Sequence, residues 1–578
     1  MTITRKSVGL TVFLILLLGL LAACAAPAAT ETGAMTEDEP EEEMAAEPAE
    51  PVEPWYDEAD VDSSYIHVCT DSPPKYGGEV VTAGAAGAMT GGNWFVFAPR
   101  DDYLFSHLVD RDTDAVTINP DVATSWDISA DGLTYTFHLR DDVRFHDGEP
   151  LTAEDIKFTL EMFFHPDTGA SHGRTSGLDM LVGAAEFESG EADNISGIKV
   201  LDDFTVELNL VAPRSSVLAN MASFNIWPKH LLEGIPFADL GETEYAVRNP
   251  VGSGPFTMGE FEPDQFYILE ANEDYYAGRP YLDRIIFRIG LGGATAFAAL
   301  ENGEIHMAGR VTAVEYERYK DDPNIVLLGG QLGGGMTVWA NHNRPRWQDA
   351  RVRQALLYAL DREAMAEAYY GDLAEVLHLR LTNPEFVSPD ITKYDYDPDK
   401  ARALLEEAGW DTEQEVSFVT YYQDDQNKRI HAAMQQYWND VGIKVDLVYL
   451  DGPSWVARVY DNDEFDLSYG CCGWFNPDQL RLSLGCDRSW PAGRNVGHYC
   501  NEEFDQLSEA AMSEPDPVKR KEMLYRATEI ITAEAGEIPV FWPTRFSAYS
   551  ADVCNNVSRQ LDEPHADRYP ATWYLAGE

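Results

Sequence analysis

Two adjacent aromatic residues, Trp474 and Phe475, lie shortly before a carboxylate, Asp478, in a segment that follows alternating apolar and polar residues at 465–469. An aromatic face binds apolar groups and sugar rings by contact, and it attracts cations through its quadrupole. The carboxylate can accept hydrogen bonds or pair with a cation. This grouping predicts noncovalent recognition of a small organic solute. The simpler interpretation is that Trp474 only packs the loop.

The chain contains none of the common catalytic or metal-binding motifs. No Gly-x-Ser-x-Gly, His-Glu-x-x-His or P-loop spacing occurs, the histidines are dispersed, and no Cys-x-x-Cys pair is present. We therefore predict that the protein is not an enzyme, with no catalytic residue, no metal site and no cofactor. A secreted lipoprotein hydrolase stays an alternative, because paired carboxylates cannot be recognised from sequence in so acidic a chain.

The amino terminus has the pattern of an export signal. Arg5 and Lys6 precede an apolar run over residues 8–23, which is shorter than the ~20 residues of a membrane span. The run ends in Leu21-Ala22-Ala23-Cys24, which resembles the lipobox of bacterial lipoproteins. That resemblance implies a signal peptide over residues 1–24, with Cys24 as the lipidated residue that anchors the mature protein to the membrane.

A strongly acidic segment follows. Residues 37–62 contain thirteen acidic residues and no Lys or Arg, so we predict a disordered tether over residues 25–75. The whole chain has 42 basic and 99 acidic residues, a formal charge of -57. Such a charge argues against nucleic acid as a partner. With 578 residues, the chain is long enough for several lobes.

Six further cysteines in an exported chain favour disulfides. Cys486 and Cys500 are fourteen residues apart around a Pro-Gly-containing loop, so we predict that they pair. Cys69 with Cys554 would join the ends of the fold, and Cys471 with Cys472 would be a vicinal bridge. Six cysteines allow fifteen connectivities, so these last pairings stay open.

The elements that would position such a site begin at residues 123–160. Tyr135, Phe137 and Leu139 alternate with polar residues and predict a half-buried strand. Asp147-Gly148-Glu149-Pro150 predicts a turn, and Thr152 is a plausible helix cap.

This stretch contains Trp-x6-Gly-x-Thr-Tyr-x-Phe-x-Leu-Arg and then Phe-x-Asp-Gly-x-Pro-Leu-Thr-Ala-Glu-Asp. The pattern resembles the signature of family 5 solute-binding proteins, the peptide, dipeptide and nickel receptors of ABC importers. A second block at residues 346–363, with a helical apolar stripe, also resembles that family. We expect Arg353 and Arg362 in this block to be solvated or paired with acids.

The resemblance implies a two-lobed α/β fold of the periplasmic-binding-protein type, with mixed sheets flanked by helices. We expect lobe I over residues 76–290, with an inserted subdomain at about 100–200, and lobe II over 291–538. Residues 539–578 would return to lobe I. The implied function is that of an extracytoplasmic receptor, a monomer that passes a peptide or another small solute to an ABC permease and ATPase complex. An oligosaccharide or a cationic solute is the alternative within the family, as is a nickel or haem ligand, although the thirteen histidines are dispersed.

The resemblance also implies where a ligand would bind. In peptide receptors an Asp in the loop that matches residues 470–478 holds the ammonium group of the ligand, and here Trp474 or Phe475 occupies its place. Recognition of an α-amino group is therefore not supported. The ligand-binding residues that we expect are Trp94, Trp339, Asn341, Trp474, Phe475, Asp478, Asn495 and Trp542.

Overall fold

The computed structural model describes residues 66–69, 72–84, 101–111, 117–165, 179–240, 243–331, 335–471, 476–489, 493–558, 567–568 and 570–576. The predicted signal peptide with Cys24 lies outside the described residues. Trp94, Cys472, Trp474 and Phe475 also lie outside them.

The inserted subdomain contains a four-stranded antiparallel sheet. Its strands are β5 (Ala123–Ile128), β6 (Thr134–Leu139), β7 (Ile198–Asp202) and β8 (Thr205–Asn209), in the order β5-β6-β8-β7. On β6, Tyr135, Phe137 and Leu139 are buried, as their alternation predicts. Helix α3 (Ala153–Phe163) packs against β7 and β8, and its first turn is fixed by Asp155, which accepts from the Thr152 N–H at 2.9 Å.

Lobe I is built on a second sheet. Its strands β9 (Phe256–Glu262), β10 (Phe266–Ala271), β11 (Arg284–Ile289), β2 (Glu79–Gly84) and β12 (Met307–Ala308) are neighbours in that order. β13 (Ile325–Gln331) and helices α10 (Ala294–Glu301) and α11 (Ala313–Tyr319) belong with them. We expected lobe II to begin at residue 291, but β12 and β13 pair in the sheet of lobe I. The chain therefore crosses between β13 and β14.

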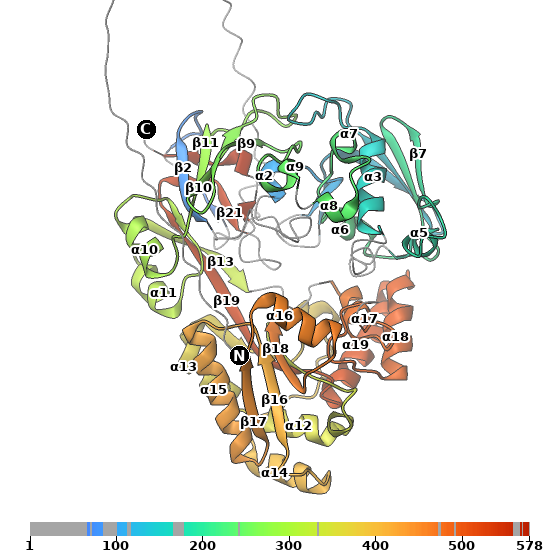
Figure 1. Ribbon diagram of the computed structural model, residues 1–578, viewed down its shortest axis with the longest axis vertical. Coiled ribbons are helices and arrows are strands. Elements are labelled where there is room, and N and C mark those ends of the chain that lie inside the picture. The colour runs from blue at the N-terminus through green and yellow to red at the C-terminus, as the bar shows by residue number, and fades with distance from the viewer. Residues whose placement is uncertain are drawn as a thin grey trace, which may run out of the picture. The chain divides into compact units, whose positions relative to one another are not determined.

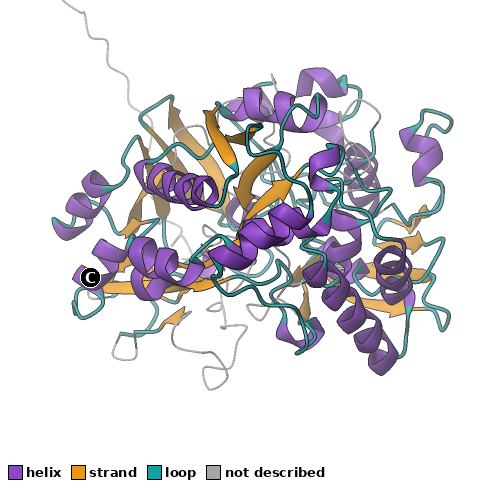
Figure 2. Ribbon diagram, turned by 90° about the horizontal axis from the view of Figure 1, so that it is seen from below, coloured by secondary structure: helices purple, strands orange, loops and turns teal. Residues whose placement is uncertain are grey.

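Lobe II has a mixed sheet in the order β17-β16-β18-β14. β16 (Glu415–Thr420), α15 (Asp425–Asp440) and β17 (Lys444–Tyr449) form the expected parallel β-α-β unit. The remaining strands of this sheet are β14 (Met336–Ala340), β15 (Ala374–Val376) and β18 (Leu467–Cys471). Helices flank the strands (Figure 2); they include α12 (Ala350–Tyr358), α13 (Arg362–Tyr370), α14 (Pro398–Glu407), α17 (Asp478–Leu484), α18 (Glu502–Ser513) and α19 (Pro517–Ala533).

One long strand, β19 (Ile538–Ser550), belongs to both lobes (Figure 1). Its first half pairs with β14 and β15 of lobe II, up to the pair of Ala374 with Pro543. Its second half pairs with β13 from the pair of Gln331 with Thr544, and with β12 beyond that. The lobes therefore meet at Pro543-Thr544, inside one continuous strand.

The two ends of the fold are joined. β1 (Ile66–His67) pairs with β21 (Asn556–Ser558), and Cys69 is bonded to Cys554 with Cα atoms 5.4 Å apart. The expected tether is therefore too long, because residues from Ile66 onward already contribute to the fold.

Two buried arginines differ from expectation. Arg353 and Arg362 are each 3 % exposed and donate to backbone carbonyls rather than to acids. Burial lowers the pKa of Arg362 to about 10. Both side chains hold segments of lobe II together.

The shorter elements are α2 (Asp101–Leu104), β3 (Val109–Arg111), β4 (Ile118–Pro120), α5 (Ala184–Glu188), α6 (Val217–Met221), α7 (Lys229–Leu232), α8 (Phe237–Leu240), α9 (Glu244–Val247), α16 (Gly452–Val456), β20 (Val553–Cys554), β22 (Asp567–Arg568) and β23 (Tyr574–Leu575). None of the described helices has the length and apolar character needed to cross a membrane.

Candidate ligand-binding region

Trp542 lies on β19, next to the point where this strand passes from one lobe to the other. It is partly buried, and its partner in the ladder is Glu375 of β15. Its neighbour Phe541 is fully buried and packs against Tyr370 with ring centroids 5.5 Å apart. Successive side chains of a strand point to opposite faces, so Trp542 faces away from the apolar side of this strand.

Trp339 of β14 is part of the interior of lobe II. It is 6 % exposed and packs in a cluster with Val419, Trp455, Val459, Phe465 and Val496. A Cβ atom on Gly470 would lie 2.3 Å from the Trp339 ring, so the ring lies directly on that backbone. The guanidinium of Arg380 is 5.7 Å from the same ring and pairs with the carboxylate of Glu537. Trp339 is therefore a packing residue, which stabilises β14 and the neighbouring Gly470 backbone from the interior of lobe II.

Asn341 and Asn495 both fix loops. The Asn341 amide donates to Asp463 at 2.7 Å and to the Phe465 carbonyl at 3.1 Å. The Asn495 amide donates to the carbonyls of Gly485 at 2.9 Å and Tyr499 at 2.7 Å. Both residues are at most 1 % exposed, so their amide hydrogens are used within lobe II.

Asp478 is the first residue of α17, and it is 1 % exposed. One carboxylate oxygen accepts from Arg520 Nη2 at 2.8 Å, and the other accepts from the Ser215 hydroxyl at 3.1 Å. Arg520 belongs to α19 of lobe II, whereas Ser215 follows the subdomain strand β8 of lobe I. The carboxylate therefore joins the two lobes.

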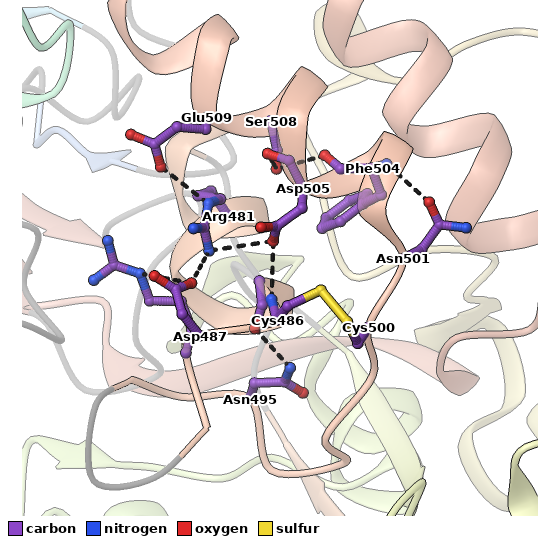
Figure 3. A network of polar contacts seen from close by, with 12 residues as sticks. Arg481, Cys486, Asp487, Asn495, Cys500, Asn501, Phe504, Asp505, Ser508 and Glu509 are labelled. Carbon is purple, nitrogen blue, oxygen red and sulfur yellow. Dashed lines mark hydrogen bonds and ion pairs between the residues drawn. A yellow bond between two sulfur atoms is a disulfide. The ribbon is translucent and has the colours of Figure 1, made fainter.

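The predicted Cys486–Cys500 disulfide is confirmed, with Cα atoms 4.5 Å apart. Figure 3 shows it beside an ion-pair network centred on Arg481 of α17. Arg481 contacts Asp487 at 2.6 Å and Glu509 at 3.0 Å, and Asp505 also accepts from the Cys486 N–H at 2.9 Å. The Cys69–Cys554 pairing is also confirmed. Cys471 is disulfide-bonded, but the vicinal bridge stays a prediction because Cys472 lies outside the described residues.

The structure adds an aromatic group that the sequence analysis missed. Tyr421 and Tyr422 follow β16 directly, with ring centroids 4.5 Å apart, and Trp455 of α16 lies 4.8 Å from Tyr421. Tyr421 is 38 % exposed, so its ring is open to contact. A signal for this site was present, since ligands of open α/β sheets bind beyond the carboxyl ends of the strands, where both tyrosines stand.

Burial sets the protonation states in this region. It raises the pKa of Tyr370 to about 12 and raises that of Tyr422 still further above its ordinary value. It also lowers the pKa of His431 to about 4. At neutral pH these side chains are uncharged. The tyrosine hydroxyls are therefore available as hydrogen-bond donors.

Comparison with known proteins gives a consistent result. Residues 117–483 match the model of bacterial extracellular solute-binding proteins, family 5 Middle. The chain is 32 % identical over 478 residues to a candidate ABC transporter peptide-binding protein of Brucella ovis, covering 81 % of this chain and 85 % of the relative. It is 26 % identical over 485 residues to the dipeptide-binding protein of Escherichia coli K12, covering 80 % and 88 %.

Among solved structures, the oligopeptide-binding protein AppA of Bacillus subtilis, in complex with a nonapeptide, matches with a TM-score of 0.73. It is 25 % identical and covers 87 % of this chain and all of its own. The sheets and helices described above thus form the two-lobed α/β fold of these receptors, which are not enzymes. The chain belongs to the family 5 bacterial extracellular solute-binding proteins of ABC transporters.

Proposed function

We propose that this protein captures a peptide, or another small organic solute, between its two lobes and delivers it to the permease of an ABC importer. The observation that carries the proposal is the sharing of β19 between the sheets of both lobes. Hinges of binding proteins are a few residues that absorb the rotation of rigid lobes around a ligand. Pro543-Thr544 is the place where such a rotation would be absorbed.

A thermal-shift screen of the purified mature chain tests this function. A solute that binds only the folded state raises its stability by mass action. Mixed peptides, oligosaccharides and divalent metals are the three panels, and we expect the peptide panel to raise the midpoint. A shift with the oligosaccharide panel alone would identify the alternative ligand class. A binding solute that leaves the radius of gyration unchanged in small-angle scattering would refute closure of the lobes.

The solute contacts that we propose are Trp94, Trp474, Phe475 and Trp542, with Tyr421 added from the structure. The other expected residues, Trp339, Asn341, Asp478 and Asn495, would act by holding the strands and loops that carry these contacts. Their internal partners support this assignment.

We also propose that the protein is a monomer anchored to the outer face of the cell membrane by lipid on Cys24. The acidic segment would then give it reach to the permease. Labelling of cells with a radioactive fatty acid tests the anchor. Cys24→Ser should abolish the label and release the protein, and unchanged retention on membranes would refute it.

A further inference from the structure

Arg545, on β19, is a half-buried cation that has neither a hydrogen bond nor an ion pair with any described residue. Two other buried arginines show the contrast. Arg362 donates to three backbone carbonyls, and Arg380 pairs with Glu537. Removing a charged group from water without a partner is costly, so an unpaired arginine in a chain with 99 acidic residues requires an explanation.

A second cation lies beside Arg545. The Val311 N–H donates to the carbonyl of Phe546 at 3.0 Å, so Arg310 and Arg545 directly precede two hydrogen-bonded residues. Arg310 is exposed, and it too has no hydrogen-bond or ion-pair partner among the described residues. Burial lowers the pKa of Arg545, and the charge of Arg310 lowers it further. The two cations thus repel each other at the junction of the lobes.

The backbone holds this arrangement at a cost. Arg310 has φ of 61°, in the left-handed region that a residue with a side chain rarely adopts. Conformations of this kind cluster at binding sites. Across the ladder, Arg545 faces Gly330, which leaves no side chain beside the guanidinium on that strand.

Three tyrosine hydroxyls, which are neutral hydrogen-bond donors, belong to the same group of side chains as the two arginines. Arg545 lies four residues beyond Phe541 on β19, and Tyr370 packs on Phe541. Tyr469 lies 5.8 Å from Tyr422, and its buried hydroxyl has no partner. Electrostatic interaction couples Arg545 to Tyr370, Tyr422 and Tyr469. Asp424, an acid that interacts electrostatically with Tyr370, is used in capping α15, where it accepts from the Asn427 N–H.

We propose that Arg545, assisted by Arg310, binds a carboxylate of the solute at the junction of the lobes. This inference rests on the proposed function and deepens it, because it assigns an acidic solute. The guanidinium fork matches a planar carboxylate through two parallel hydrogen bonds. Arg545 and Arg310 both lie in lobe I, whereas Tyr370, Tyr422 and Tyr469 lie in lobe II, so one anion would contact both lobes.

The test measures binding by isothermal titration to protein that has been unfolded and refolded to remove any bound solute. The probes are trialanine as the free acid, trialanine as its carboxyl-terminal amide, glutarate and inorganic phosphate. We expect at least one carboxylate to bind the wild type and the amide to bind at least tenfold more weakly than the acid. In Arg545→Gln the affinity for that carboxylate should fall roughly 10-fold to 100-fold, the loss typical of a hydrogen-bonded charge.

Each outcome decides between the two proposals. Binding of glutarate without trialanine would refute the peptide receptor and support the carboxylate site. Equal binding of acid and amide, retained in Arg545→Gln, would support the receptor and overturn the site. Binding of phosphate alone, or of none of the four probes, would overturn the assignment of a carboxylate.

A structural role for Arg545 is tested in the absence of solute. Arg362→Gln is the matched control, because it removes a buried arginine whose carbonyl partners would be left unpaired. We expect Arg362→Gln to lower the midpoint of urea unfolding and Arg545→Gln to leave it unchanged or raise it. A loss in Arg545→Gln as large as that in the control would overturn the proposal.

Discussion

The substitution Asp478→Asn tests whether this carboxylate is a structural connection or a solute contact. The change keeps the shape of the side chain and removes its charge. In the wild type the buried carboxylate accepts from Arg520 and from Ser215 of the other lobe. Asparagine retains one carbonyl oxygen for one of these donors, and the other donor loses its partner.

The expected loss of unfolding free energy follows from the burial of the Asp478 carboxylate. A hydrogen bond to a charged group contributes about 1.5–3 kcal/mol. The Arg520 side chain is 17 % exposed and keeps its bond to the Ala511 carbonyl at 3.1 Å, so water and this carbonyl offset part of the loss. We therefore expect the free energy of unfolding to fall by about 2 kcal/mol in Asp478→Asn.

The matched control is Asp487→Asn, in the network centred on Arg481, which lies on α17 as Asp478 does. Asp487 contacts Arg481 at 2.6 Å, but its side chain is 63 % exposed, and exposed pairs contribute about 0–1 kcal/mol. Urea unfolding without solute, followed by tryptophan fluorescence, measures both variants. Equal losses would contradict the argument from burial. A tenfold loss of solute affinity in Asp478→Asn without a loss of stability would make the carboxylate a direct solute contact.

Three further predictions follow. Cys486→Ser with Cys500→Ser should lower stability by ~3 kcal/mol, because the loop of fourteen residues gains freedom in the unfolded chain, and an unchanged urea midpoint would refute this. The His431 pKa of about 4 lies below its unfolded value of about 6.5, so His431 makes stability fall as the pH drops from 6.5 toward 4, by ~2 kcal/mol at pH 5. His431→Gln should flatten urea midpoints measured across that range, and an unchanged slope would contradict this. Trp474→Ala should weaken solute binding by more than ~1 kcal/mol in a fluorescence titration, and unchanged affinity would show that the loop is only structural.

Local sequence patterns predicted the elements of this fold well. The alternation of Tyr135, Phe137 and Leu139 corresponds to a strand buried on that face, and α3 begins directly after Thr152, its expected cap. These patterns succeed because period and capping depend on residues a few positions apart. The Cys486–Cys500 disulfide was also predictable, since a short loop brings its ends together.

Properties that depend on distant partners were not predictable. Asp478 was expected to be available to a solute, but Ser215 is 263 residues away in sequence and occupies one of its oxygens. Arg362 was expected to be solvated, but its carbonyl partners include Pro539, 177 residues away. The lobe boundary at residue 291 was misplaced for the same reason, because β12 is assigned to lobe I by its pairing with the distant strand β2, and β13 by its pairing with the second half of β19.

The contacts between the lobes differ in kind from those within each lobe. The large apolar clusters of the described residues each lie within a single lobe. Polar contacts across the lobes include Ser215 with Asp478, Arg214 with Glu509 at 3.2 Å, and Arg488 with Asp179 at 2.8 Å. Separating the lobes would therefore leave these apolar clusters intact and would exchange these polar contacts for water, each of which contributes about 0.5–3 kcal/mol. Under the proposed function, a solute that contacts both lobes would supply free energy of that size, which would be sufficient to shift the balance between an open and a closed state.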